Sequence, residues 1–275
     1  MVHELRPSEY ESVRSLFQPL RFHLSSAAVL DGNNPGQVFV DDPDGPQSAF
    51  MLSPEGGYLA GDPDNRSFVR ALHRAIVVEG VLGEEVHVLS LVVHPARWRG
   101  QLSTLLDPHT PSEMRRRHYV CRRVRYDWRA RLPDGCMVRR IDRRLLDMDE
   151  LSVPDHVTGW MVNNWGSAER FLEGGFGFVT LCAGEVASWS LTDCVSGDGC
   201  EIGIRTAPAH RRRGLATLTA AAAVEHALAH GFAMVGWHCP EENRGSIGTA
   251  EKVGFLRERD YVAYYAMLDE QQSSS

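Results

Sequence analysis

A short run of basic and small residues, Arg211-Arg-Arg-Gly-Leu-Ala216, follows a predicted strand over Glu201–Thr206 and opens a predicted helix. Backbone N–H groups at a helix N-terminus have no partner within the helix and point along the positive end of its dipole, an arrangement that binds phosphate. Gly214 would let the backbone approach a diphosphate closely, and the arginines add positive potential. A solvated basic turn that only caps the helix is the alternative, because short Gly/Arg motifs recur by chance.

A second run lies one helix and one strand further on. Asn243-Arg-Gly-Ser246 opens a predicted helix, and Ala250-Glu-Lys-Val-Gly-Phe255 closes it. Taken in order, the two runs resemble the cofactor motifs of the GNAT superfamily of N-acetyltransferases, over about Met137 to Leu268. Trp237-His-Cys239 together with the second run resembles the group typified by the zwittermicin A resistance acetyltransferase.

This resemblance implies an N-acetyltransferase that moves an acetyl group from acetyl-CoA to a primary amine, most simply of a small molecule, by direct attack with a general base. It implies one set of residues for acetyl-CoA: Ile204, Arg205, Thr206, Arg211, Arg212, Arg213, Gly214, Leu215, Ala216, Asn243 and Ser246. A catalytically inactive acyl-CoA-binding or interaction protein of the same fold is the alternative function.

Two residues are candidates for the general base. Glu201, Gly203 and Arg205 share one face of an extended strand, and Glu201 stands where the resemblance places a base. His238, at the end of a strand, is the second candidate. Each has a structural alternative: a strand-edge ion pair for Glu201 and an ordinary strand-end histidine for His238.

The chain departs from the family pattern at Ala250, where many relatives carry a tyrosine that protonates the leaving thiolate. Ser246, Tyr261 or water would have to supply that proton. For the acceptor pocket we expect Trp160, Asn163, Asn164 and Trp165, although tryptophan and asparagine also serve as core and capping residues.

Two other clusters carry less chemistry. His226 and His230 have the spacing of metal ligands on a helix, but the sequence His-Ala-Leu-Ala-His lacks the glutamate of a metalloprotease motif, so we expect no metal site. Arg115–Arg117 is basic enough to touch nucleic acid. The formal net charge of −7 instead favours a solvated face and no nucleic-acid partner.

The elements that must position these residues form two α/β cycles. In the second we expect strands over 137–142, 176–181, 185–192, 201–206, 232–237 and 261–268, and helices over about 145–173, 215–230 and 244–252. In the first we expect a hairpin of 37–40 and 48–52, helices over 66–81 and about 101–106, and strands over 86–93 and 118–128. The fold class is therefore α/β, with a mixed sheet of α+β character.

The segment Arg131–Cys136 reads as the junction, which divides the chain into an N-terminal domain over 1–130 and a catalytic domain over 131–275. The first domain should be a degenerate GNAT-like half. Where its phosphate loop should lie it has Gly61-Asp-Pro-Asp64, whose carboxylates would repel a diphosphate, so we expect no cofactor there.

Composition is typical of a soluble globular protein, with 43% hydrophobic and 24% charged residues, and we expect a cytoplasmic location for the following reasons. The first residues lack the pattern of a signal peptide, and no apolar run is long enough for a membrane span. Six cysteines without a C-x-x-C pair predict free thiols and no disulfide framework. The tail from Gln271 to Ser275 reads as disordered, and the sequence does not predict an oligomeric state.

Overall fold

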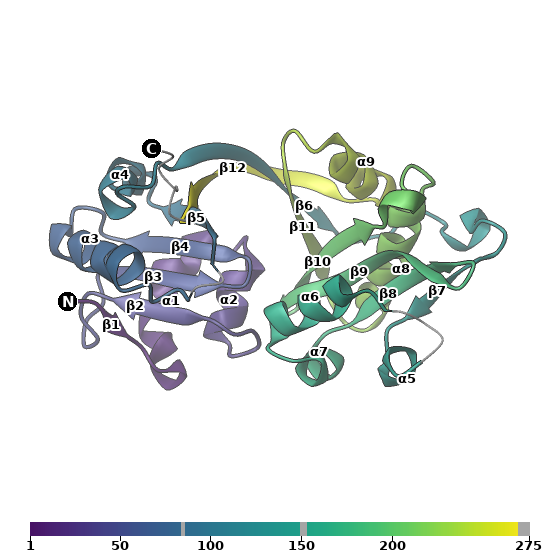
Figure 1. The fold of residues 1–275 in the computed structure, drawn as a ribbon, viewed down its shortest axis with the longest axis horizontal. Helices are drawn as coiled ribbons and strands as arrows, with labels where there is room; N and C mark the ends of the chain where they lie inside the picture. The colour runs from purple at the N-terminus through teal and green to yellow at the C-terminus, as the bar shows by residue number, and fades with distance from the viewer. Residues whose placement is uncertain (84–85, 149–152, 269–275) are drawn as a thin grey trace, which may run out of the picture. The chain divides into compact units, whose positions relative to one another are not determined.

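The computed structural model describes residues 1–83, 86–148 and 153–268 (Figure 1). The chain divides into two structural units, and the boundaries fall within strands β6 (Ser112–Cys121) and β12 (Leu256–Met267). The first unit comprises Met1–Arg115 together with the chain from Val262 onward, and the second comprises Arg116–Tyr261. The tail from Gln271 lies outside the described residues.

This division differs from the expected boundary between residues 130 and 131. Most of β6 belongs to the second unit because Arg116–Cys121 pair antiparallel with β11 (Met234–Pro240). The end of β12 returns to the first unit because Tyr264–Met267 pair with β5 (Val88–His94). Backbone hydrogen bonds between strands far apart in the sequence therefore set the boundary, and the turn at 131–136 does not.

The first unit contains a mixed sheet with the strand order β1-β2-β3-β4-β5-β12. Its remaining elements are β1 (His3–Glu4), η1 (Pro7–Val13), α1 (Arg14–Phe17), η2 (Gln18–Leu20), α2 (Leu24–Leu30), β2 (Gln37–Val40), β3 (Ser48–Ser53), β4 (Gly56–Gly61), α3 (Arg66–His73), η3 (Arg74–Val78), η4 (Ala96–Gln101) and α4 (Leu102–Leu105). The expected hairpin is β2–β3.

The second unit has the strand order β6-β11-β10-β9-β8-β7. Its remaining elements are η5 (Arg129–Arg131), β7 (Cys136–Arg140), α5 (Arg143–Leu146), α6 (Asp155–Trp165), α7 (Ala168–Gly174), β8 (Gly177–Cys182), β9 (Glu185–Ser196), β10 (Gly199–Thr206), η6 (Pro208–His210), α8 (Leu215–Ala229) and α9 (Arg244–Val253). Part of the expected helical region, residues 149–152, lies outside the described residues.

Helix α8 is buried almost all round, although the sequence predicts a single apolar face. Its alanines are small enough to pack against the sheet on one side and α9 on another, and Ala220–Val224 are all buried. The same core contains Cys200 and Ile202 of β10 and Trp237 of β11. A wide apolar surface fixes the start of α8 relative to these strands, which is where the basic turn lies.

Each unit contains a strand–helix–strand segment with a parallel strand pair: β4–α3–β5 in the first and β10–α8–β11 in the second. The two helix starts differ. In α3 the N-cap Asn65 accepts a hydrogen bond from the backbone of Phe68, whereas α8 begins at Gly214 with no side-chain cap hydrogen bond. The orphan N–H groups of α8 are therefore left for another partner.

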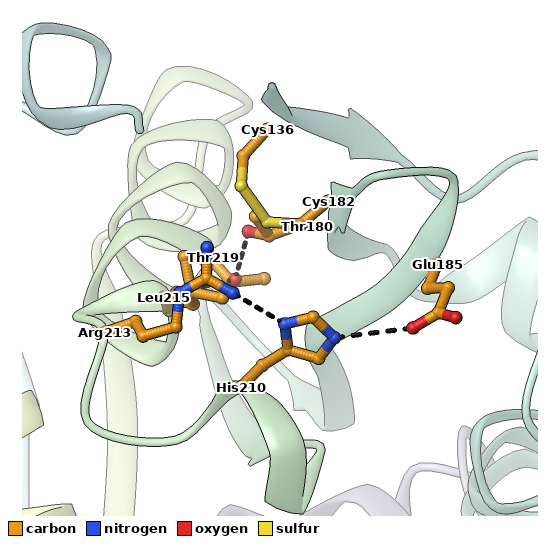
Figure 2. Close-up of a disulfide and its surroundings, with 8 residues drawn as sticks. All are labelled: Cys136, Thr180, Cys182, Glu185, His210, Arg213, Leu215 and Thr219. Atoms are coloured by element: carbon orange, nitrogen blue, oxygen red, sulfur yellow. Dashed lines mark hydrogen bonds and ion pairs between the residues drawn. A yellow bond between two sulfur atoms is a disulfide. The ribbon is translucent and has the colours of Figure 1, made fainter. Parts of the chain in front are cut away.

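Cys136 and Cys182 form a disulfide, so the expectation of free thiols is wrong for this pair (Figure 2). The two residues stand directly opposite each other where β7 begins and β8 ends. The sequence hides the pairing because the cysteines are 46 residues apart. Cys121, Cys194, Cys200 and Cys239 are buried and belong to no disulfide. Within the described part of the chain, every helix is too short or too polar to traverse a bilayer.

Candidate functional site

A pocket of about 640 Å³ opens at the N-terminus of α8. It brings together all but one of the residues expected to hold acetyl-CoA, the exception being Arg213. Its lining consists of Ile204, Arg205, Thr206, His210, Arg211, Arg212, Gly214, Leu215, Ala216, Thr217, Asn243, Gly245, Ser246, Thr249 and Lys252. Residues from two motifs, almost 30 positions apart in the sequence, thus share one cavity.

The turn before α8 has the backbone of an anion-binding loop. Gly214 has φ +79°, a left-handed conformation that favours glycine, and a Cβ added there would meet nothing within 4 Å. Arg212 also has a positive φ of +61°, which is uncommon for a residue with a side chain. Alternating backbone conformations of this kind turn successive N–H groups toward a common point.

The pocket is cationic although the whole chain carries a formal net charge of −7. Arg205, Arg211, Arg212 and Lys252 line it, and none of the described lining residues is acidic. A polyanion such as a diphosphate suits this charge and the uncapped helix start.

Arg213 points to the hairpin between β8 and β9 (Figure 2). Its Nη1 lies 2.9 Å from His210 Nδ1, and His210 Nε2 lies 3.5 Å from the Glu185 carboxylate. Because a guanidinium can only donate, Nδ1 of His210 accepts and Nε2 carries the proton. Of the three consecutive arginines, two therefore face the pocket and the third ties the turn to the neighbouring hairpin.

Asn243 and Ser246 have structural contacts in addition to their position on the pocket. Asn243 Oδ1 accepts a hydrogen bond of 3.0 Å from the backbone of Ser246 and so caps α9. Ser246 Oγ accepts a bond of 2.9 Å from Trp237 Nε1. The Asn-x-x-Ser spacing therefore builds the helix start, whatever else it binds.

Strands β10 and β11 part next to Glu201. Among the described residues, their parallel pairing covers Gly199–Glu201 and Met234–Gly236, after which β10 continues beside β9 and β11 beside β6. Glu201 lies three residues before Ile204, so it stands about 10 Å along the strand from the pocket lining. A β-bulge at this point leaves Asp193 as the extra residue of β9, and bulges commonly re-aim side chains beside active sites.

The two candidate bases, Glu201 and His238, are hydrogen-bonded to each other. His238 Nε2 lies 3.0 Å from Glu201 Oε1, and the two side chains are 11% and 6% exposed. The thiol of Cys194 lies 3.6 Å from the other carboxylate oxygen. Cys200 and Ile202 pack toward α8, so Glu201 between them faces the opposite side of the sheet.

Tyr261, which the sequence suggested only as a proton donor, belongs to this group together with Arg116 and His118, which the sequence did not indicate. Tyr261 Oη lies 3.1 Å from His238 Nδ1, and Arg116 Nε donates to the same oxygen over 2.8 Å. Arg117 pairs with Glu241 at 2.8 Å. The expectation that Arg115–Arg117 forms only a solvated face is therefore wrong for its last two members.

His118 stands opposite His238 in the β6–β11 register, and their rings stack with centroids 4.5 Å apart and an angle of 14°. Burial first, and then the neighbouring His238, lowers the pKa of His118 to about 3. The ring is therefore neutral at pH 7, and the 3.2 Å approach of its Nδ1 to Glu258 is not an ion pair.

Donor atoms of His118, Glu201 and His238 lie within 4.8 Å of one another, close enough for a metal ion. Imidazole lone pairs lie in the ring plane, however, and two nearly parallel stacked planes do not meet at a common ion. One ring would have to rotate before both could bind. The hydrogen-bonded arrangement needs no such change.

The residues expected to line the acceptor pocket have different environments. Trp165 is buried and donates to the Thr192 carbonyl, and buried Asn164 donates to the Trp160 carbonyl, so both belong to the α6 core. Asn163 is exposed. Trp160 contacts the sheet beside Glu201: its indole packs on Gly203 of β10, where an added Cβ would lie 2.6 Å from the ring, and its Nε1 donates to Asp193.

The rings of His226 and His230 contact each other with centroids 3.8 Å apart and planes tilted by 33°. His226 also packs against Phe176 and Phe178. Burial, and then His230, lowers the pKa of His226 to about 4. These contacts give the pair a packing role on α8.

Comparisons with known proteins point to the family that the sequence motifs resemble. A family model described as GNAT acetyltransferase matches residues 14–264. The chain is 27% identical over 270 residues to an uncharacterized N-acetyltransferase of Bacillus subtilis strain 168, covering 97% of this chain and 99% of the relative.

Solved structures share the fold over nearly the whole chain. A GCN5-related N-acetyltransferase-like protein from Streptococcus suis matches with a TM-score of 0.70 and 24% identity, covering 94% of this chain and 98% of the other. A tandem GNAT protein from the clavulanic acid biosynthesis pathway matches with a TM-score of 0.55 and 14% identity, covering 98% and 99%.

Proposed function

Because the chain belongs to the GNAT acetyltransferase family, we propose that it is an acetyl-CoA-dependent N-acetyltransferase acting on the primary amine of a small molecule. The observation that carries the proposal is the cationic pocket at the uncapped start of α8. A buried Glu201–His238 pair lies about 10 Å from the pocket lining along β10, where β10 and β11 part.

The pocket fits the diphosphate of acetyl-CoA. The open space over Gly214 leaves room for phosphate oxygens against the backbone, and Arg211 and Arg212 supply charge. Lys252, which belongs to the second run, and Thr249, which the sequence did not single out, line the same cavity from α9. When bound, acetyl-CoA would supply the activated acetyl thioester.

Glu201 is the proposed general base. It would accept a proton from the acceptor ammonium, directly or through water, and the neutral amine would then be nucleophilic. The hydrogen bond from His238 holds the carboxylate in place. Trp160 on Gly203, bonded to the buried carboxylate of Asp193, offers an aromatic and acidic surface that suits a cation.

Ala250 of α9 is fully buried in the hydrophobic core, and its methyl side chain cannot supply a proton to a thiolate. Ser246 stands one turn earlier on the same face of α9 and lines the pocket. Its oxygen accepts a hydrogen bond from Trp237, and its hydroxyl also bonds the buried Cys239 thiol, so Ser246 would have to turn its proton from Cys239 toward the thiolate. We place Ser246 first among the proton donors.

Calorimetric titration with acetyl-CoA and thiol release across a panel of primary amines test the proposal. We expect acetyl-CoA to bind, and we expect at least one primary amine of the panel to cause release of the coenzyme A thiol. Binding without release from any amine would favour the second candidate, an inactive acyl-CoA-binding protein, for which Ala250 is the specific observation. Absence of binding would exclude both.

A further inference from the structure

Four side chains form a continuous series of hydrogen bonds that ends on Glu201. Arg116 Nε lies 2.8 Å from Tyr261 Oη, Tyr261 Oη lies 3.1 Å from His238 Nδ1, and His238 Nε2 lies 3.0 Å from Glu201 Oε1. The residues come in that order from β6, β12, β11 and β10. The permanent cation Arg116 is thereby connected to the Glu201 carboxylate through Tyr261 and His238, each of which can donate or accept a proton in these hydrogen bonds.

The chemistry of the two ends fixes the direction of the two outer bonds, and the middle bond between Tyr261 and His238 then runs toward Glu201 if the His238 ring is neutral. A guanidinium only donates, and an ionised carboxylate only accepts. Tyr261 therefore accepts from Arg116 and turns its own proton to His238 Nδ1, while His238 Nε2 carries the imidazole proton toward Glu201. In this state all donors point toward Glu201, and His238 is the neutral Nε2–H tautomer.

The competing state is an imidazolium at His238 paired with Glu201. It would require Nδ1 to become a donor, and Tyr261 would then have to turn its proton away. It would also place a second positive charge close to Arg116 in a site where Glu201 is 6% exposed and His238 11%. The stacked ring of His118 adds no negative charge to offset that cost.

We propose that Arg116 and Tyr261 are positioning residues that keep His238 neutral, so that Glu201 receives an N–H hydrogen bond and not a full positive charge. The inference rests on the proposed function, in which Glu201 is the base. A carboxylate beside an imidazolium holds a proton less well, and it would be a weaker base for the ammonium.

Several other groups surround the pair and stay unchanged in the variants below. From the elements packed around it these are Arg122 and His118 of β6, Asp193 and Cys194 of β9, Cys200 of β10, and Glu258 and Arg259 of β12.

The first test reads the protonation of the two ring nitrogens of His238 by two-bond 1H–15N NMR at pH 7, without substrate. His238→Gln assigns the signals among the 12 histidines. We expect an unprotonated Nδ1 and a protonated Nε2 in the wild type. In Tyr261→Phe we expect protonation of Nδ1, because the donor to it is gone while Glu201 remains.

Tyr261→Phe keeps the edge contact with the His238 ring, whose centroid lies 5.6 Å from that of Tyr261, so the fold should survive. Arg116→Gln should change His238 in the same direction, and Arg116→Lys should restore part of the wild-type state. Tyr126→Phe, which removes a hydroxyl outside this series, is the matched control. An imidazolium in the wild type, or unchanged nitrogens in both Tyr261→Phe and Arg116→Gln, would overturn the inference.

The second test is the pH dependence of kcat/KM with the most reactive primary amine of the panel. In Tyr261→Phe the form with a neutral His238 ring should be lost at a higher pH than in the wild type, so we expect the acidic limb to move up by about one pH unit, which is a tenfold loss on that limb. KM for acetyl-CoA should stay unchanged. If the NMR result holds but no amine reacts with the wild type, the proposed function fails while the assignment of His238 stands. If the acidic limb stays in place, the positioning role is wrong.

Discussion

Glu201 is a carboxylate that is almost completely buried, yet it is surrounded by hydrogen-bond donors. Its partner His238 reaches it from the adjacent parallel strand, and Cys194 approaches it from the antiparallel neighbour on the other side. A buried charge persists only where such partners replace water. At the residue scale, the structure therefore joins two candidates that the sequence offered as alternatives.

Glu201→Gln should lower kcat by about 10²–10⁴, because an amide cannot accept the ammonium proton. Affinity for acetyl-CoA should change little, since the pocket residues are untouched. Steady-state kinetics and calorimetry measure the two quantities. Glu173→Gln, at an exposed position on α7, is the matched control. Full turnover by Glu201→Gln would show that another group, such as His238, removes the proton.

His118 makes the second unit sensitive to acid. Its pKa in the folded chain is about 3, whereas an unfolded histidine titrates near about 6.5, so the unfolded state binds the proton more readily. The stability from the neutral ring is fully present above about pH 6.5 and is lost as the pH falls from there toward 3. The slope from this one group is up to about 1.4 kcal/mol per pH unit.

Urea unfolding at pH 7 and pH 5 measures this dependence. We expect His118→Gln to lose less stability between the two pH values than the wild type does. His3→Gln, at an exposed position, should behave like the wild type. Equal losses in His118→Gln and the wild type would contradict the assignment of a buried neutral ring.

At the element scale, local patterns predicted most of the second cycle. The predicted helix over 215–230 is α8, and the predicted strand over 185–192 is the first part of β9. Both have strong composition signals, namely an alanine-rich run ended by glycine and an apolar run between turns. In the first cycle the sequence missed β4, whose three glycines weaken the strand signal, and α2, and it placed β6 about six residues too late.

The candidate site could be predicted only in part, because some of its residues are neighbours in the sequence and others meet only through strand pairing. The cofactor loop is contiguous, so its residues could be listed from the sequence. Arg116, His118 and Tyr261 reach Glu201 only through the pairing of β6 with β11 and the return of β12. Strand registers between distant segments depend on tertiary packing, which periodicity does not encode.

The Cys136–Cys182 disulfide lies against the first turn of α8. Cys182 shares a buried cluster with Leu215 and Leu218, and Thr180 of β8 bonds Thr219 of α8 at 2.6 Å (Figure 2). A closed segment of 46 residues predicts about 4 kcal/mol of stability from the cross-link. Breaking it should also loosen the helix start that lines the pocket.

Alkylation after denaturation should therefore label four of the six cysteines without reductant and all six with it. We expect reductant to lower the urea midpoint and to weaken acetyl-CoA binding several-fold. The double variant Cys136→Ser/Cys182→Ser should already have both properties and should no longer respond to reductant. Labelling of all six thiols without reductant would show that the bond is absent.

At the scale of the whole molecule, two units share a strand–helix–strand plan but differ at the helix start. In the first unit Asn65 caps α3, Asp64 pairs with Arg97, and Asp62 bonds the backbone of Asp64. The corresponding turn of the second unit is uncapped and cationic. A diphosphate would meet carboxylates and a satisfied helix end in one unit, and open N–H groups and arginines in the other.

Calorimetric titration of acetyl-CoA into the wild type and Gly214→Asp tests this central claim most directly. The aspartate would fill the space over the loop and repel phosphate, and it would strain a residue with φ +79°. Gly231→Asp is the matched control, because Gly231 follows the other end of α8, has φ +96° and also faces open space. We predict one site per chain in the wild type and in Gly231→Asp, and none in Gly214→Asp that remains folded by circular dichroism. Two sites in the wild type, or undiminished binding by folded Gly214→Asp, would contradict the placement of acetyl-CoA at the start of α8.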